Sequence, residues 1–412
     1  MKTYCISLMI ILFLGLVGCK KDRETPNLTP KQINLTAQAP VVINSNNAFG
    51  IELFKRITLE EDGNFMLSPL SASVALTMLL NGCGGDTYTQ LKETLQYPEE
   101  LEIGDINEAY SSLVIQLLQA DSKVKIAIAN AIFYRLGFEV KPLFLSTMSQ
   151  HYDAHIQGLD FGLPSALAII NGWASDNTYQ KIPKVLDEID PDAVMFLMNA
   201  LYFKGDWSYQ FDKSQTQLRP FSLDNGTSID VNTMHGEVGA KCTLGESYNA
   251  IELPYGRTNF TMVIVVPTES LDELYSSFNA ETWNEITISM DEFSEYSSVE
   301  VFMPKFIFSY EKYLNDQLIS MGMVDAFIPF VADLSGISDA SIYVNFVKQN
   351  TFVEVNEEGT EAAAVTTIGV YETSVGPGNP PIFIVDKPFI FAIRERTTNT
   401  LMFIGKVENP QE

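Results

Sequence analysis

The sequence predicts a mixed α+β fold, with one large folded domain over residues 46–412. Two features of the composition support this, and a series of motifs described below supports it further. No linker rich in Pro, Gly or Ser divides the chain after residue 46, so one domain is more economical than the two or three that a prior of ~150 residues each would suggest. The hydrophobic content of 46% is ample for a large core.

The most informative segment is residues 357–381. Its Glu and Ala residues favour a helix by composition, but residues 360–370 alternate as a strand does. Small or apolar uncharged side chains stand at every second position, namely Thr360, Ala362, Ala364, Thr366, Ile368 and Val370. This alternation is typical of a strand with one side buried. The run 376–381 cannot continue a sheet and indicates an exposed loop. The segment is therefore suited to two states, a buried strand and an exposed loop.

Motifs spread over residues 46–409 resemble those of the serpin family, in the family's order. They are Asn64–Ser71 with Leu76–Gly82, Asn199–Trp207 with Phe211, Thr216 and Phe221, Phe302–Phe306, Leu318–Met323, Ala332–Gly336, Asp386–Phe391 and Phe403–Val407. The resemblance implies a serpin fold, with a large central, mostly antiparallel sheet, further sheets, about nine helices and an exposed reactive loop at about residues 357–381.

The resemblance also implies a function, the covalent suicide inhibition of serine endopeptidases, with papain-like cysteine endopeptidases as a further class. In such an inhibitor the protease cleaves the loop and forms an acyl-enzyme. The freed upstream segment then inserts into the central sheet as a new strand and drags the protease with it. The alternative within the family is a non-inhibitory serpin that acts as a binding or chaperone-like module.

The hinge of this loop, by resemblance, comprises Glu357, Glu358, Gly359, Thr360, Glu361, Ala362, Ala363 and Ala364. Insertion requires an inward face without charge, because burying an unpaired charge carries a large desolvation penalty. Thr360, the first inward residue, is small and neutral, and the alanines add no bulk. The inward face of the hinge therefore favours an inhibitory member of the family.

We place the scissile bond between Thr373 and Ser374, by counting from Glu357 as far as inhibitory serpins usually run. Counting back from Pro380 gives a different bond, because extra residues lie in between. The upstream count is preferred because it sets how far the protease is dragged, whereas extra residues downstream stay in a tolerant loop. From Thr360 to Thr373 a strand at ~3.3 Å per residue spans roughly 45 Å, enough to cross the molecule.

A threonine at the cleavage site suits a protease with a small or shallow pocket, of elastase or subtilisin type. Tyr371 offers a chymotrypsin-like site, and Val375 offers another small one. These alternatives stay open, as does the identity of the target protease.

A second set of residues is expected where the central sheet opens. Many serpins have a histidine under this sheet, and here the resemblance places Gln349. The side chains of Ser68, Ser71, Asn199 and Gln349 are expected to hydrogen-bond across the strands that must part. Trp207 is expected near the top of the sheet, where insertion begins.

Residues 1–18 are typical of a bacterial lipoprotein signal peptide. The apolar run 4–17 follows Lys2 and is shorter than the ~20 residues of a membrane-spanning helix. Residues 16–19 resemble a lipobox, in which Cys19 would become the lipid-bearing mature N-terminus; a plain signal peptide is the alternative. Residues 19–45 are polar and predict a flexible lipid-anchored tether. We therefore expect an exported protein, anchored in the bacterial cell envelope at the outer membrane or cell surface.

No other site chemistry is indicated. The three histidines are His151, His155 and His235. The first two are spaced four apart, as on a helix face, but no His-Glu-x-x-His pattern or third ligand accompanies them, so we interpret them as surface histidines. Without a histidine-centred site a nucleophilic hydrolase is not supported. We expect no metal, no cofactor and no enzymatic activity.

Charge and cysteine content exclude further classes. The net charge of −26 argues against nucleic acid as a partner, because phosphate recognition needs a basic stripe. The scattered Lys and Arg residues argue against a polyanion, and we expect a monomer. Cys83 and Cys242 are expected to be free, mostly buried thiols, with a disulfide in an oxidising envelope as the alternative.

Overall fold

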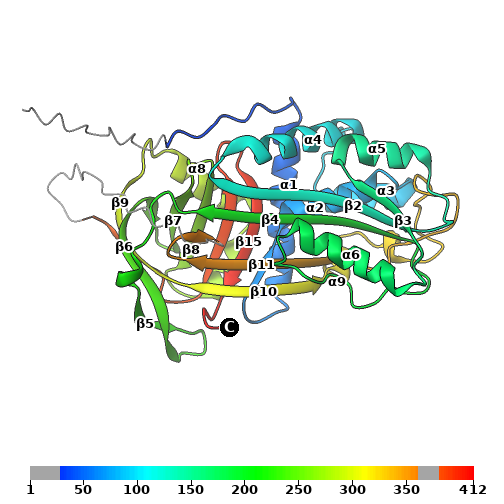
Figure 1. The fold of residues 1–412 in the computed structure, drawn as a ribbon. Helices are drawn as coiled ribbons and strands as arrows, with labels where there is room; N and C mark the ends of the chain where they lie inside the picture. Colours follow the sequence, from blue (N-terminus) through cyan, green and yellow to red (C-terminus); the bar gives the residue numbers. More distant parts are fainter. Residues whose placement is uncertain (1–27, 361–379) are drawn as a thin grey trace, which may run out of the picture.

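The computed structural model describes residues 28–360 and 380–412 (Figure 1). Nine α-helices lie in these residues, as the family resemblance predicts. They are α1 (Ala39–Thr58), α2 (Pro69–Leu80), α3 (Gly85–Thr94), α4 (Ile103–Ala120), α5 (Pro142–Tyr152), α6 (Pro164–Asn177), α7 (Leu271–Ser277), α8 (Ala280–Asp291) and α9 (Asn315–Ser320). Two 3₁₀ helices accompany them, η1 (Lys213–Gln215) and η2 (Asp325–Phe327).

The strands form two sheets. The central sheet has six strands, in the order β10 (Phe306–Tyr313), β11 (Lys348–Asn356), β12 (Gly359–Thr360), β4 (Met195–Asp206), β2 (Val124–Arg135) and β3 (His155–Leu159). Within it β2 and β3 pair in parallel, whereas the other neighbours pair antiparallel. The large, mostly antiparallel central sheet is therefore confirmed.

The second sheet has nine strands. Its path is β1 (Phe65–Leu67), β15 (Thr400–Val407), β14 (Phe389–Glu395), β8 (Phe260–Pro267), β7 (Tyr248–Tyr255), β6 (Ser228–Leu244), β9 (Ser297–Pro304) and β13 (Ile382–Ile384), with β5 (Gln217–Ser222) beside β6. The strands β8, β14 and β15 are buried along their whole length, which accounts for their nearly continuous apolar sequences.

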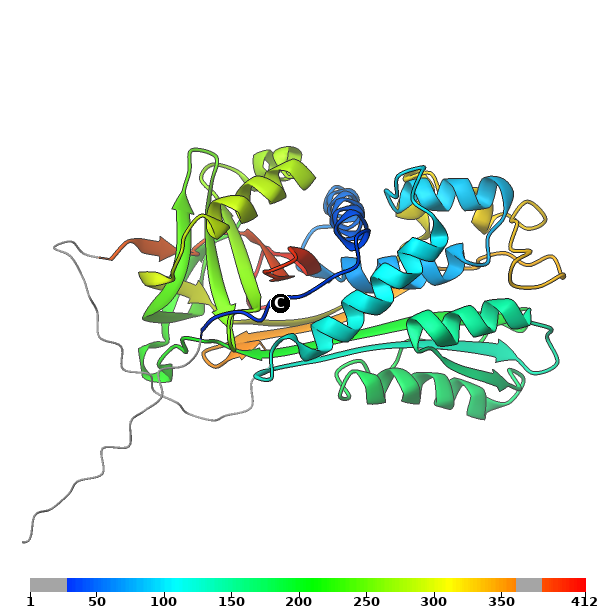
Figure 2. The same ribbon diagram turned by 90° about the horizontal axis from the view of Figure 1, so that it is seen from above.

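Helix α2 lies at the centre of the core, between the two sheets. It is apolar on almost every side, as expected of a buried helix. It begins with Pro at its first turn, and the hydroxyl of its N-cap residue Ser68 accepts the backbone N–H of Ser71. Figure 2 shows α6 on the opposite face of the central sheet from α1, α2 and α4. The inner face of this sheet is therefore sealed by the core, and its outer face carries α6.

The folded part begins before the predicted boundary at residue 46. Helix α1 starts at Ala39, because apolar side chains such as Val42 and Ile43 are buried in the core. Upstream of it, Lys31 and the Asn259 side chain exchange two hydrogen bonds of 2.8 Å. The tether predicted over residues 19–45 is therefore partly folded against the domain. No helix in residues 28–360 and 380–412 is both long and apolar enough to cross a membrane.

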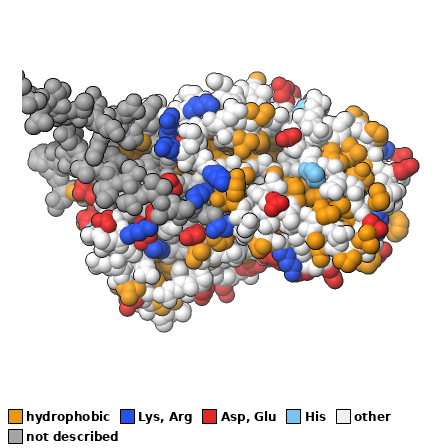
Figure 3. All heavy atoms as spheres, viewed as in Figure 1, with side chains coloured by type: hydrophobic (Ala, Val, Ile, Leu, Met, Phe, Trp, Pro, Cys, Tyr) orange, Lys and Arg blue, Asp and Glu red, His pale blue; other side chains and the backbone are white. Residues whose placement is uncertain are grey.

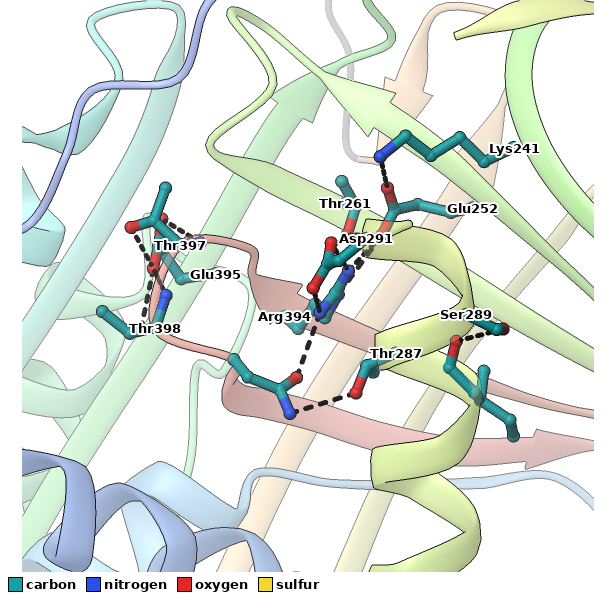
Figure 4. A network of polar contacts seen from close by, with 12 residues as sticks. Lys241, Glu252, Thr261, Thr287, Ser289, Asp291, Arg394, Glu395, Thr397 and Thr398 are labelled. Atoms are coloured by element: carbon teal, nitrogen blue, oxygen red, sulfur yellow. Dashed lines mark hydrogen bonds and ion pairs between the residues drawn. The ribbon is translucent and has the colours of Figure 1, made fainter. Parts of the chain in front are cut away.

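A buried ionic network ties the C-terminal hairpin of β14 and β15 to the rest of the second sheet (Figure 4). Arg394 on β14 is fully buried and donates to Glu252 on β7 (2.6 Å) and to Asp291 at the end of α8 (2.8 Å). Lys241 on β6 lies 3.9 Å from Glu252. Burial by itself raises the pKa of Glu252, but the charges of Arg394 and Lys241 outweigh burial, so the net shift is downward. The network therefore couples β6, β7, β14 and α8.

Replacing Arg394 with Met is expected to lower the free energy of unfolding by about 3–5 kcal/mol, because Glu252 is left buried without its main partner. Urea denaturation measures this loss. Adding Glu252→Gln should restore part of it, because the neutral amide needs no counter-charge. Strictly additive losses in the double variant would show that the two side chains are not coupled.

Candidate functional site: a hinge above an open cleft

The short strand β12 lies between β11 and β4 and pairs antiparallel with both. Thr360 stands opposite Val355 of β11 and opposite Gly205 of β4. Gly359 fits here because a Cβ at its position would collide with the Gly205 carbonyl oxygen. The predicted hinge therefore enters the central sheet at its first two strand residues.

The side chain of Thr360 faces the core. It is 4% exposed, and its hydroxyl lies 2.6 Å from the hydroxyl of Tyr255 on β7. Tyr255 in turn stacks on Trp207, with ring centroids 4.4 Å apart and planes 11° from parallel. The indole of Trp207 donates to the carbonyl of Asn356 (2.9 Å), and its backbone N–H donates to the carbonyl of Glu358 (2.8 Å). Trp207 thus holds the turn between β11 and β12, at the end of the sheet where it was expected.

Two glutamates fasten the hinge from outside the sheet. Glu357 is buried, accepts the Thr216 hydroxyl (2.7 Å) and lies 3.0 Å from the Lys305 ammonium. Glu358 pairs with Lys213 of η1 at 2.5 Å. Burial by itself raises the pKa of Glu357, but the hydrogen bond from Thr216 and the charge of Lys305 lower it, and the net shift is downward. The start of the hinge is therefore fixed, so any movement must begin after Thr360.

Beyond Thr360, β4 and β11 line opposite sides of a cleft. In the part of the chain that the structure describes, β12 alone pairs with both strands. Because neighbouring strands lie ~4.8 Å apart, β12 already separates β4 from β11 by the width of one strand. The cleft that continues from there has a volume of about 350 Å³. Its apolar lining includes Leu197 and Leu201 of β4, Leu76 and Leu79 of α2, and Phe403 of β15.

Three of the residues expected at the sheet opening form one cluster. Gln349 of β11 accepts the backbone N–H of Ser68 and donates to the Ser68 carbonyl, both at 2.9 Å. The Ser68 hydroxyl accepts the N–H of Ser71 and donates to the Met402 carbonyl (2.9 Å). This cluster ties β11 to the start of α2. Asn199 does not join it.

Asn199 instead pairs along the other side of the cleft. Its amide donates to Asn130 of β2 at 2.7 Å, and Asn130 donates to the carbonyl of Tyr152 at 2.7 Å. Asn199 and Gln349 both line the cleft, so each wall has its own polar cluster. The sequence identifies these residues as polar groups near the opening but does not show that they belong to different walls.

The outer face of the sheet carries a basic row that the sequence analysis did not identify. Lys125 of β2 and Lys204 of β4 are direct cross-strand partners, and like charges in such positions repel. Lys125 lies over the ring of Tyr179, 3.3 Å from its centroid. Figure 3 shows basic side chains close together over these ends of β2 and β4. The description of Lys and Arg as scattered therefore does not hold here, because strand pairing gathers residues far apart in the sequence.

The remaining predicted residues fall into two groups. Glu361–Ala364, Tyr371, Thr373, Ser374, Val375 and Cys19 lie outside the described residues. Cys83 and Cys242 are both free thiols. His151 ends on α5 whereas His155 begins β3, so they share no helix face. His235 lies 3.1 Å from Glu300, and residues 28–360 and 380–412 contain no group of three His, Cys, Asp or Glu arranged for a metal.

Comparison with known proteins places this geometry. Residues 44–410 match the family model described as serpin (serine protease inhibitor). The leukocyte elastase inhibitor of Xenopus laevis is 33% identical over 88% of this chain and 97% of its own length. Among solved structures, the native state of the thermophilic serpin tengpin superimposes with a TM-score of 0.80 at 31% identity, covering 92% of this chain and 96% of that one.

A structure of human thyroxine-binding globulin in complex with thyroxine is also similar. Its TM-score is 0.81 at 27% identity, covering 91% of this chain and 100% of that one. A family model spanning most of the chain, an alignment of this length and the shared fold agree with one another. The chain belongs to the serpin family.

Proposed function

We propose that this protein is a single-use covalent inhibitor of serine endopeptidases, with papain-like cysteine endopeptidases as a second class of target. The observation that carries the proposal is the placement of β12. Gly359 and Thr360 pair with both β11 and β4 at the head of a cleft that continues between the same two strands. The family contains such inhibitors, including the related leukocyte elastase inhibitor.

The proposed reaction begins at the loop. The serine Oγ of the protease attacks the carbonyl carbon of Thr373, the peptide bond to Ser374 breaks, and the new amino group of Ser374 leaves with the serine proton. The product is an ester between Thr373 and the protease. Insertion must then precede attack by water on this ester, because hydrolysis would release an active protease.

The register of β12 shows where the inserted strand would end. If the antiparallel pairing of Thr360 with Gly205 continues, residue 370 faces Met195, the first residue of β4. Thr373 would then lie just past the end of the sheet, opposite residue 192. This length supports Thr373 over positions further upstream, because a bond near the end of the strand draws the protease across the whole sheet. It does not separate Thr373 from Val375.

The same register gives the basic row a role in the first step. It would place Glu361 on the outer face, opposite Lys204 on one side and Glu354 on the other. Lys181 already lies 3.8 Å from Glu354 and partly offsets its charge. Insertion would therefore complete a row in which the repelling pair Lys125 and Lys204 gains a carboxylate.

The variant Lys204→Glu is expected to shift the outcome from inhibition towards turnover. Glu361 would then meet a carboxylate on both sides, and slower insertion gives water more time to hydrolyse the ester. Cross-strand charge pairs contribute roughly 0.2–1 kcal/mol, so the number of inhibitor molecules used per protease should rise about two- to fivefold. Titration of protease activity measures this number.

Lys123→Glu makes the same charge change on an exposed residue outside the row, and it should leave the stoichiometry near the wild-type value. The swap Lys204→Glu with Glu361→Lys should restore inhibition. An equal effect of both single variants would assign the result to net charge rather than to the row.

The function itself is tested by incubating residues 20–412 with elastase-, subtilisin-, chymotrypsin- and papain-type proteases. We expect a band at the summed mass that survives a denaturing gel. The released C-terminal peptide should begin at Ser374, and mass analysis fixes its first residue. Cleavage without such a band in all four classes would contradict inhibition and favour the binding module.

Thr360→Arg serves as the matched variant in this experiment. The hydroxyl of Thr360 contacts Tyr255 in a buried position, so an arginine there has no counter-charge and blocks the start of insertion. The variant should be cleaved as a substrate and form no stable band. Trapping at wild-type efficiency would contradict the assignment of Thr360 as the first inserted residue.

The alternative is a non-inhibitory binding module, since the solved complex of thyroxine-binding globulin with thyroxine has the same fold. The two functions differ in what loop cleavage does. Insertion completes the central sheet and should raise the melting temperature of the cleaved protein, whereas a module that does not insert should show no rise.

We further propose that the protein is exported and anchored by a lipid on Cys19, in the cell envelope at the outer membrane or cell surface. The support is the resemblance of residues 16–19 to a lipobox. Cys19→Ser should move the protein from the membrane fraction to the soluble fraction in a bacterial host. Continued membrane retention of this variant would contradict the anchor.

A further inference from the structure

An exposed aromatic side chain stands at one end of the molecule without a role in the site above. Phe330 lies in the turn Ile328–Ala332, which follows η2, and is 90% exposed. Its neighbours Ile328 and Val331 are 40% and 51% exposed. Single exposed apolar residues are common, but three within four positions form a patch that water does not favour.

The backbone holds Phe330 in this position. Its φ of +67° lies in the left-handed region, which bulky side chains rarely adopt. The turn is closed by hydrogen bonds from Val331 and Ala332 to the carbonyl of Ile328, at 3.1 and 3.0 Å. A bulky residue kept in a disfavoured conformation and in water is a reason to look for a functional constraint.

The turn is connected to the far end of the cleft. The backbone N–H of Val344 donates to the carbonyl of Ala326 in η2 at 2.8 Å. Val344 and its neighbours Ile342 and Tyr343 line the cleft, and Tyr343 is 44% exposed. Figures 1 and 2 both show this part of the chain at the end of the molecule opposite the end of β4.

The length of the loop indicates what would reach this end. The pairing of Thr360 with Val355 on β11, continued residue by residue, brings Thr373 opposite Ile342. A protease bound to Thr373 as an ester would therefore arrive beside Tyr343 and the Phe330 turn. Its active-site rim would face the patch, because the ester holds that side of the protease against the inhibitor.

We infer that the patch formed by Ile328, Phe330, Val331 and Tyr343 is a docking surface for the trapped protease, and that it slows release of that protease. This inference rests on the proposed inhibitory function. The surface acts after insertion, so it affects the lifetime of the covalent complex and leaves the initial encounter unchanged. Its occupant is the apolar rim of the active site of a serine endopeptidase.

The test is the decay of a preformed complex with a subtilisin- or elastase-type protease. Phe330→Asn removes the ring and keeps a residue that tolerates positive φ, so the fold should be retained, as an unchanged melting temperature would verify. We expect unchanged rates and yields of complex formation, and a several-fold faster return of protease activity. Phe330→Leu should decay at an intermediate rate.

The matched control is Leu218→Asn, an apolar residue on β5 that is 65% exposed and lies at the other end of the molecule. It should not change the decay. Wild-type decay of the Phe330→Asn complex, or equal acceleration by Leu218→Asn, would overturn the docking surface alone. Failure of the wild-type protein to form any complex would overturn the proposed function, and the docking surface with it.

Discussion

The pairing of two residues, Gly359 and Thr360, with strands on both sides is the constraint on which the rest of the site depends. A strand in a sheet places alternate side chains on opposite faces, so fixing Thr360 inward fixes the face of every residue that would follow. A shift of one position would turn Glu361 into the core and the alanines outward. The hinge therefore sets the direction, the faces and the length of any inserted strand.

The contacts around this pairing divide the hinge into a fixed part and a free part. Glu357 and Glu358 are held by Lys305 and Lys213, which come from the second sheet and from η1. The Trp207 side chain closes the turn between them and β11. With these residues held in place, a released loop would extend from one end only. The polar clusters of Gln349 and Asn199 keep each wall of the cleft attached to its own side of the molecule, so the cleft can be filled without breaking them.

The sequence predicts the parts of the site that depend on local pattern and on family motifs. Alternation alone indicates that Thr360 faces inward, and the motifs locate Trp207 and Gln349 correctly at the sheet. It does not predict contacts that depend on strand register. The pairing of Lys125 with Lys204, the partnership of Asn199 with Asn130, and the cleft itself all require knowing which strands are neighbours.

The start of the folded domain shows the same limit from the other direction. Residues 28–45 look like spacer because Thr, Asn, Gln and Pro predominate. They are ordered because Ala39, Val42 and Ile43 share one face of α1 and because Asn259 captures the backbone of Lys31. Three apolar residues at helical spacing are a weak signal in a polar stretch, and a backbone captured by a distant side chain leaves no local signal at all.

The cleft between β4 and β11 has room for one strand. A molecule whose only vacancy of this kind accepts one strand can act once, so protection by such a molecule is a titration. While it outnumbers the protease, free protease stays near zero; once the protease is in excess, all of the surplus is active. The cell would then experience a sharp threshold set by the number of molecules it has made, and affinity would matter little on either side of it.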